Sequence, residues 1–142
     1  MKTQIQYRFR KVDIAQFAMF LENYSDQIKD VAFKTDAQFG FDKNQNVLCS
    51  RIGVAMFKDD RPLLKIELCC YFEITAETIE NIRKDDQYVF VPALLVQFAS
   101  LCYGTLRGVM HMKTLNTPLN NFILPPVYFD EIINKPFVVP CK

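Results

Sequence analysis

The side chains that could do chemistry in this 142-residue chain are few and far apart. His111 is the single histidine, so any Cys-His or Ser-His catalytic pair would have to use it. It lies on a helix otherwise devoted to packing, which favours a surface or interface role. Two carboxylate pairs, Asp59 with Asp60 and Asp85 with Asp86, fall in predicted turns, where acidic residues serve solubility and turn formation. No Gly-rich phosphate loop or H-E-x-x-H signature is present, so we do not expect an enzyme.

The cysteines are the other reactive side chains. They are odd in number and no two have the C-x-x-C spacing of zinc and redox sites. We therefore expect reduced thiols, most of them acting as small core hydrophobes, and neither a metal site nor a cofactor. They are Cys49, Cys69, Cys70, Cys102 and Cys141.

Composition narrows the class of protein. Half of the residues are apolar, 13 of them Phe, with only 4 Gly, which favours a large core or apolar surface left for a partner. The 17 basic and 16 acidic residues leave a net charge of +1 without a Lys/Arg block, so nucleic acid is not an expected partner. The first 12 residues alternate polar with apolar and form no secretory h-region, which predicts a cytoplasmic protein.

Apolar and polar residues alternate with period two in four segments, which predicts four strands. These are residues 3–11, 31–41, 47–57 and 63–74, and polar turns at 42–46 and 58–62 join the last three into an antiparallel meander. A crossover segment separates the first strand from the second. No repeat, low-complexity tract or linker interrupts the chain, so we expect a single domain over residues 1–142.

Three helices are predicted to pack on this sheet in an α+β architecture. A capping-box pattern at Asp13, with apolar residues on one face after it, predicts a short helix in the crossover. Thr75 is the expected N-cap of a second short helix that runs through Arg83. The third and longest covers about 93–113.

The long helix could be mistaken for a membrane span, because residues 87–106 carry no charge. One narrow polar stripe runs down it, and this indicates a buried helix of a soluble protein instead of a membrane insertion. Small residues on the same helix would allow another backbone to approach closely. Either a second subunit packs there, or the small residues accommodate bulky Phe and Tyr of the same domain. The stripe consists of Gln97, Ser100, Gly104, Arg107 and His111.

The order of signals from Tyr88 to Phe129 carries a family resemblance. Phe90-Val91-Pro92 opens the long helix, Arg107-Gly108 lies near its end, and the segment 124–129 reads L-P-P-V-Y-F. This order resembles the C-terminal half of the SecB-like export chaperones, in which a last helix follows. The resemblance implies an ATP-independent chaperone that holds unfolded polypeptides and has no catalytic residues. It also implies a homo-oligomer, dimer or tetramer, with the long helix between paired sheets.

The resemblance further implies where binding takes place. The peptide groove is expected near the crossover and the final helix, and a promiscuous surface there would suit the adaptable side chain of Met19. The expected groove residues are Ile14, Phe17, Met19, Phe20, Leu21, Tyr24, Val127 and Phe129. The expected oligomer interface is Ala99, Ser100, Gly104, Arg107 and Gly108.

Three functions remain open at this point. The chain could be a general or export-type chaperone, a dedicated SecB-like chaperone of one partner such as an antitoxin, or a non-chaperone module that binds a small apolar ligand. The balanced charge and the short tail PFVVPCK do not predict an acidic docking face for the export ATPase SecA.

Overall fold

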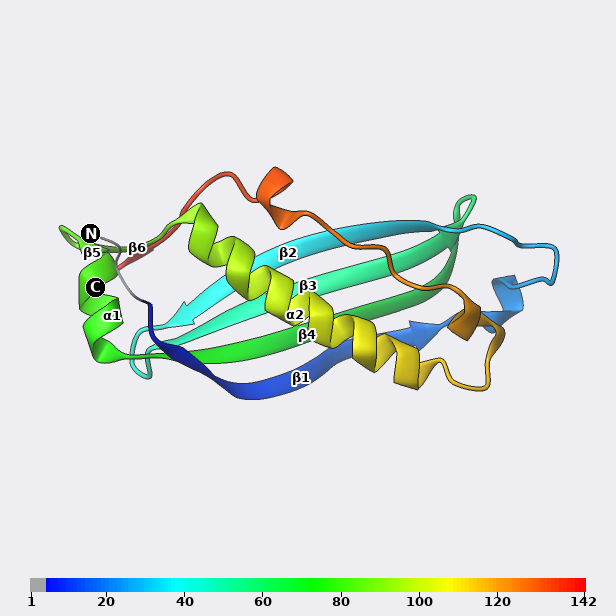
Figure 1. Cartoon of the computed structure of the whole chain (residues 1–142), viewed down its shortest axis with the longest axis horizontal. Helices are drawn as coiled ribbons and strands as arrows, with labels where there is room; N and C mark the ends of the chain where they lie inside the picture. The colour runs from blue at the N-terminus through cyan, green and yellow to red at the C-terminus, as the bar shows by residue number, and fades with distance from the viewer. Residues whose placement is uncertain (1–4) are drawn as a thin grey trace.

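The computed structural model describes residues 5–142 and contains one large sheet, one small sheet and two α-helices (Figure 1). In chain order the elements are β1 (Tyr7–Met19), the 3-10 turn η1 (Leu21–Asn23), β2 (Ala32–Asp42), β3 (Val47–Lys58), β4 (Arg61–Ile74), α1 (Ala76–Ile82), β5 (Arg83–Lys84), β6 (Gln87–Phe90), α2 (Pro92–Lys113), the 3-10 turns η2 (Pro118–Asn121) and η3 (Phe129–Glu131), and β7 (Phe137–Pro140).

The large sheet has the strand order β1-β4-β3-β2, and every pair in it is antiparallel. Strands β2, β3 and β4 form the predicted meander. Their tight turns contain Asn46 and Asp59 with positive φ, a conformation that Asn and Asp tolerate better than most residues. Because β1 pairs with β4, the chain must cross over two strands to reach β2, which confirms the predicted crossover and the α+β class.

The predicted crossover helix is wrong, because β1 continues as a strand to Met19. The pairing with β4 runs from Tyr7 opposite Ile74 to Met19 opposite Leu64, and it is interrupted by two β-bulges, at Arg10 and at Ala15. The long ladder overrides the local helix signal. The crossover retains only the single turn of η1. Residues 3 and 4 of the predicted first strand lie outside the described residues.

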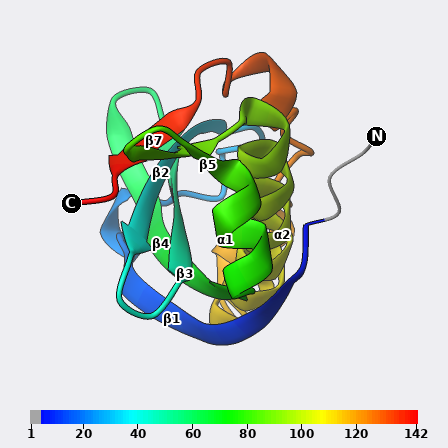
Figure 2. The same ribbon diagram turned by 90° about the vertical axis from the view of Figure 1, so that its left-hand side faces the viewer.

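Helix α2 covers one face of the large sheet and closes the core. Its buried side packs on β3 and β4, where Leu48, Ile52 and Leu68 are completely buried. Phe98 of α2 lies 4.5 Å from Phe72 of β4, measured between ring centroids. Figure 2 shows α2 beside one face of this sheet and the β5-β6-β7 sheet at its end.

Helix α1 begins where the sequence predicts. The Thr75 hydroxyl accepts a hydrogen bond from the Thr78 amide at 3.2 Å, as an N-cap residue does. The expected last helix is wrong, because the chain beyond Phe129 forms only η3 and then the strand β7, which pairs with β6. Prolines at 136 and 140 disfavour a helix in this segment.

Helix α2 is long and apolar enough to cross a membrane by length and composition alone. Core helices of soluble proteins pass the same test, and here eight side chains of α2 are buried within the protein. The structure therefore uses this helix as the packing partner of the sheet.

Candidate polypeptide-binding surfaces

A row of apolar side chains on β1 forms the first candidate surface. We call it the β1 strip, and it comprises Phe9, Val12, Ile14, Phe17 and Met19. All five lie opposite core residues of β4, so they share the face of the sheet that carries α2. The five residues are not spaced at every second position, but each bulge adds one residue and so keeps them on the same face.

Helix α2 leaves much of the β1 strip uncovered. It crosses the sheet on a diagonal (Figure 1) and contacts β1 near its start, where the Phe98 ring lies 4.8 Å from that of Tyr7, but it leaves the next residues of the strip largely uncovered. Phe9 is consequently 47% exposed, and Val12 and Ile14 are each 43% exposed. Phe17 is better covered, with Lys113 of α2 lying 5.6 Å from its ring centroid. A partly exposed apolar row of this kind is typical of a surface that binds a partner.

The backbone of β1 adds a second property to this surface. Strand β1 is at the edge of the large sheet, and within residues 5–142 only β4 pairs with it. The peptide groups on its outer side are therefore available to another extended chain. An exposed apolar row beside a free strand edge is the arrangement that β-strand addition requires.

The crossover extends the β1 strip beyond Met19. The Phe20 amide donates to the Leu63 carbonyl at 2.9 Å, and the Asn23 side chain donates to the Pro62 carbonyl at 2.8 Å, so the turn is tied to the start of β4. Leu21 is 42% exposed, whereas Phe20 and Tyr24 are half-buried. These three predicted groove residues therefore follow directly on from Ile14, Phe17 and Met19.

The other two predicted groove residues lie elsewhere. Val127 lies just before η3 and Phe129 is its first residue, and this segment lies on the side of α2 opposite to β1 (Figure 1). Phe129 is only 2% exposed and its ring lies 5.6 Å from that of Tyr103, whose hydroxyl donates to the Pro125 carbonyl. Phe129 is a core residue in this structure, which corrects its place in the expected groove. Val127 is half-buried against the same core.

The outward side of α2 forms the second candidate surface. We call Ser100, Gly104, Arg107 and Gly108 the glycine face; all four are exposed. A Cβ atom placed on either glycine would meet no atom within 4 Å. Within residues 5–142 nothing packs against these two glycines closely enough to require that they be small. Ala99, which we expected with them, is instead fully buried against the sheet.

A hollow of about 540 Å³ borders the glycine face. It lies between the C-terminal half of α2 and the segment that follows η2, and Ile123 stands 72% exposed on its rim. His111 and Arg107 line it together with apolar side chains, as in a surface made for a largely apolar partner.

Two of the buried or half-buried cysteine thiols have raised pKa values. Burial raises the pKa of Cys49 to about 12, with the Cys69 thiol as the next cause. A hydrogen bond with Cys70, followed by burial, raises the pKa of Cys102. Such thiols stay protonated and are weak nucleophiles. Within residues 5–142 no group of three or more His, Cys, Asp or Glu side chains could hold a metal ion.

Sequence reasoning missed two exposed members of the β1 strip. Phe9 was expected on the buried face of a short strand, and Val12 fell at the expected boundary between strand and helix. Spacings of three, two, three and two along the strip were the available signal, because two bulges in one strand produce this pattern.

Comparisons with known proteins support the fold. No protein-family model matches the chain, and no curated protein matches its sequence. The structure of the SecB-like chaperone Rv1957 from Mycobacterium tuberculosis, in complex with a ChAD peptide from the Rv1956 HigA1 antitoxin, superposes with a TM-score of 0.60. The match covers 85% of this chain and 89% of that chain, at 12% sequence identity. This likeness establishes a SecB-like fold.

Proposed function

We propose that this protein is an ATP-independent chaperone of the cytoplasm that holds unfolded polypeptides in an extended conformation along β1. The observation that carries the proposal is the exposed apolar row of the β1 strip beside a free strand edge. Backbone hydrogen bonds from the edge would supply affinity without regard to sequence, and alternate side chains of the client would lie on the strip.

The geometry of the β1 strip favours a polypeptide over a small apolar ligand. The exposed residues Phe9, Val12 and Ile14 extend along a strand and into the crossover at Leu21, so they offer a length of surface instead of an enclosed cavity. Small-molecule sites bury most of the ligand in a concave pocket. A module for a small apolar ligand is therefore the less favoured function.

We further propose that the protein assembles as a dimer or tetramer through the glycine face. Gly104 and Gly108 leave open space on the outward side of α2, and this allows the backbone of a second subunit to approach closely. Replacing both glycines with Leu should leave the fold of the subunit intact, because a Cβ at either position meets nothing within 4 Å in residues 5–142 and Leu favours helix over Gly. Light scattering should then show a loss of the oligomer.

A dedicated chaperone is the second candidate. The SecB-like chaperone of similar fold is bound to an antitoxin peptide, which is consistent with guarding one partner, and the balanced charge of this chain does not predict an acidic docking face for SecA. A general chaperone should bind many unfolded proteins with similar affinity. A dedicated one should bind a single partner far more tightly than the others.

The test is suppression of aggregation without ATP. The purified protein, after its mass in solution has been measured, is mixed at stoichiometric amounts with a chemically unfolded client that aggregates on dilution. The proposal expects slower aggregation with the protein present. If the folded protein has no effect on several clients, the general chaperone function is refuted, and the next step is a search for one partner.

A further inference from the structure

The face of the sheet opposite to α2 carries a separate hollow of about 470 Å³, near the turn between β2 and β3. Its volume lies within the ~300–1,000 Å³ that ligand pockets usually have. It shares no lining residue with the β1 strip or the glycine face, and neither surface accounts for it. The residues that line it are Arg10, Lys11, Gly40, Phe41, Asp42, Gln45, Val47, Cys49 and Tyr71.

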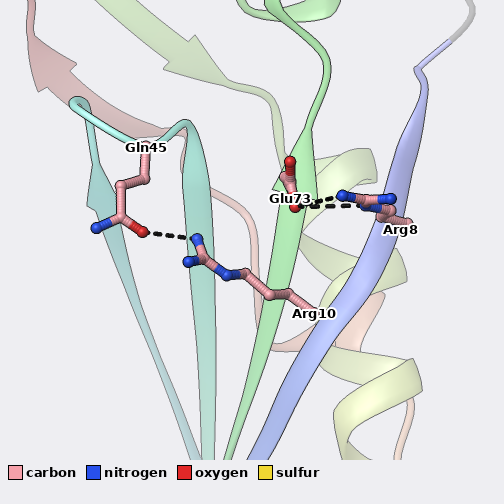
Figure 3. A network of polar contacts seen from close by, with 4 residues as sticks. All are labelled: Arg8, Arg10, Gln45 and Glu73. Atoms are coloured by element: carbon pink, nitrogen blue, oxygen red, sulfur yellow. Dashed lines mark hydrogen bonds and ion pairs between the residues drawn. The ribbon is translucent and has the colours of Figure 1, made fainter.

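Arg10 reaches this hollow because of the first bulge of β1. The bulge leaves Arg10 without an opposite residue on β4, and its guanidinium extends across to the turn, where Nη1 donates to the Gln45 side-chain oxygen at 2.6 Å (Figure 3). Gln45 is neutral, and Arg10 forms no ion pair within residues 5–142. Arg8, two residues earlier, is instead paired with Glu73 at 3.1 Å.

A second cation and a neutral floor complete the hollow. Lys11 Nζ lies 5.9 Å from the Tyr71 ring centroid and 3.2 Å from an Asp13 oxygen. Burial raises the pKa values of both Tyr71 and Cys49, so neither brings a negative charge at neutral pH. Among the described residues Asp42 is the one carboxylate in the lining, and it already accepts a hydrogen bond from the Asn44 amide in the turn.

The floor of the hollow is open enough for a flat apolar group. Gly40 lies across from Cys49 on the neighbouring strand, and a Cβ on Gly40 would meet nothing within 4 Å. An aromatic ring placed there would contact Val47 and Tyr71 while lying close to both cations, which attract the face of a ring. The guanidinium of Arg10 keeps unused donors for a carboxylate.

We propose that this hollow binds an acidic side chain that is adjacent to an aromatic one, in a polypeptide held by the protein. The carboxylate pairs with Arg10 and the ring lies over the floor, so the opposite face of the sheet selects clients by an acidic and aromatic pair. This inference rests on the proposed function, because it assumes that unfolded polypeptides are the ligands.

The test uses a fluorescein-labelled hexapeptide, Gly-Ser-Asp-Phe-Ser-Gly, and two relatives that replace its Asp with Asn or its Phe with Ala. Fluorescence anisotropy should show the Asp-Phe peptide binding more tightly than both relatives. The R10Q substitution should weaken the affinity for the Asp-Phe peptide by about two- to fivefold, the usual value of an exposed ion pair. Added salt should reduce this difference in affinity between R10Q and the unmodified protein. R8Q is the matched control, since it removes the same charge from the same strand outside the hollow.

The outcomes separate the two proposals. Equal binding of the Asp and Asn peptides, or equal effects of R10Q and R8Q, would overturn the acidic-aromatic site whatever the aggregation assay shows. Amide shifts of Gly40 and Lys11 in a nuclear magnetic resonance titration should accompany binding, and shifts confined to the β1 strip would also overturn it. Aggregation suppression that depends on the β1 strip tests the chaperone function independently, because the strip lies on the other face.

Discussion

Replacing Val12 with Ser should weaken client binding by about threefold. Val12 is 43% exposed on the β1 strip, and burying a whole Val side chain is worth ~1.5 kcal/mol or more. Burying only the exposed part contributes about 0.6 kcal/mol, which is about a threefold change in Kd. The assay is the fluorescence anisotropy of a labelled client kept unfolded by reduction and carboxymethylation, titrated with each variant at 25 °C.

Val91→Ser is the matched control for this experiment. Val91 is 44% exposed, so the same substitution removes the same amount of exposed apolar surface, but from the start of α2 and away from the β1 strip. Ser also suits the N-cap position that Val91 occupies, where no side-chain cap exists at present. Equal affinity of Val12→Ser and the unmodified protein, or an equal loss with Val91→Ser, would refute the assignment of the β1 strip as the client surface.

Three further outcomes concern stability and reactivity. Thr75→Ala should remove the cap of α1 and lower the free energy of unfolding by about 1 kcal/mol in a urea titration. Gly53→Ala should destabilise by no more than about 1 kcal/mol, because its Cβ, 2.6 Å from an Asp36 oxygen, meets the end of an exposed side chain that can turn away, and Gly40→Ala, which meets open space, should cost nothing; a much larger loss at either position in the urea titration would contradict this. Folding raises the pKa of Cys49 from 9.0 to about 12, so the stability that this thiol contributes is complete below about pH 9 and is lost as the pH rises toward 12. At about pH 8.5 iodoacetamide should therefore modify Cys49 far more slowly in the folded protein than in the unfolded protein, as measured by mass spectrometry.

The central sheet and the long helix could be predicted from the sequence because each keeps a simple period. Strand β4 has an apolar residue at every second position from Leu64 to Ile74, and all six of these are buried, with Cys69 buried on the opposite face as well. Pro92 at the start of α2 and the polar turns between strands mark the ends of their elements. In these segments local preference and tertiary packing agree.

The continuation of strand β1 from residue 12 to Met19 could not be predicted because two bulges change its period. Each bulge adds one residue, so Phe9, Val12, Ile14 and Phe17 follow one another at three, two and three positions. Part of this pattern coincides with helical spacing, and the pairing partner that decides between strand and helix lies in β4, far along the chain. A single sequence contains no direct signal for that pairing.

The candidate surfaces were predictable only in part, for the same reason. The small residues of α2 are visible as a pattern, but which of them face outward depends on how α2 rotates on the sheet, and Ala99 turns inward. Phe129 is of a residue type that suits an apolar groove, but in the structure its ring packs against that of Tyr103 and is buried. Exposure of an apolar side chain follows from the whole arrangement, not from its own type.

The pairing of β1 with β4 has a consequence for how the protein is made. Arg8 and its ion-pair partner Glu73 are separated by 65 positions in the chain. At the usual synthesis rate of about 5–20 residues per second, the ribosome needs about 3–13 s to produce the strand that β1 requires. During that interval the β1 strip has no partner in its own chain. A copy still being synthesised would then expose an unpaired apolar strand. It would resemble the unfolded clients that we propose complete copies hold.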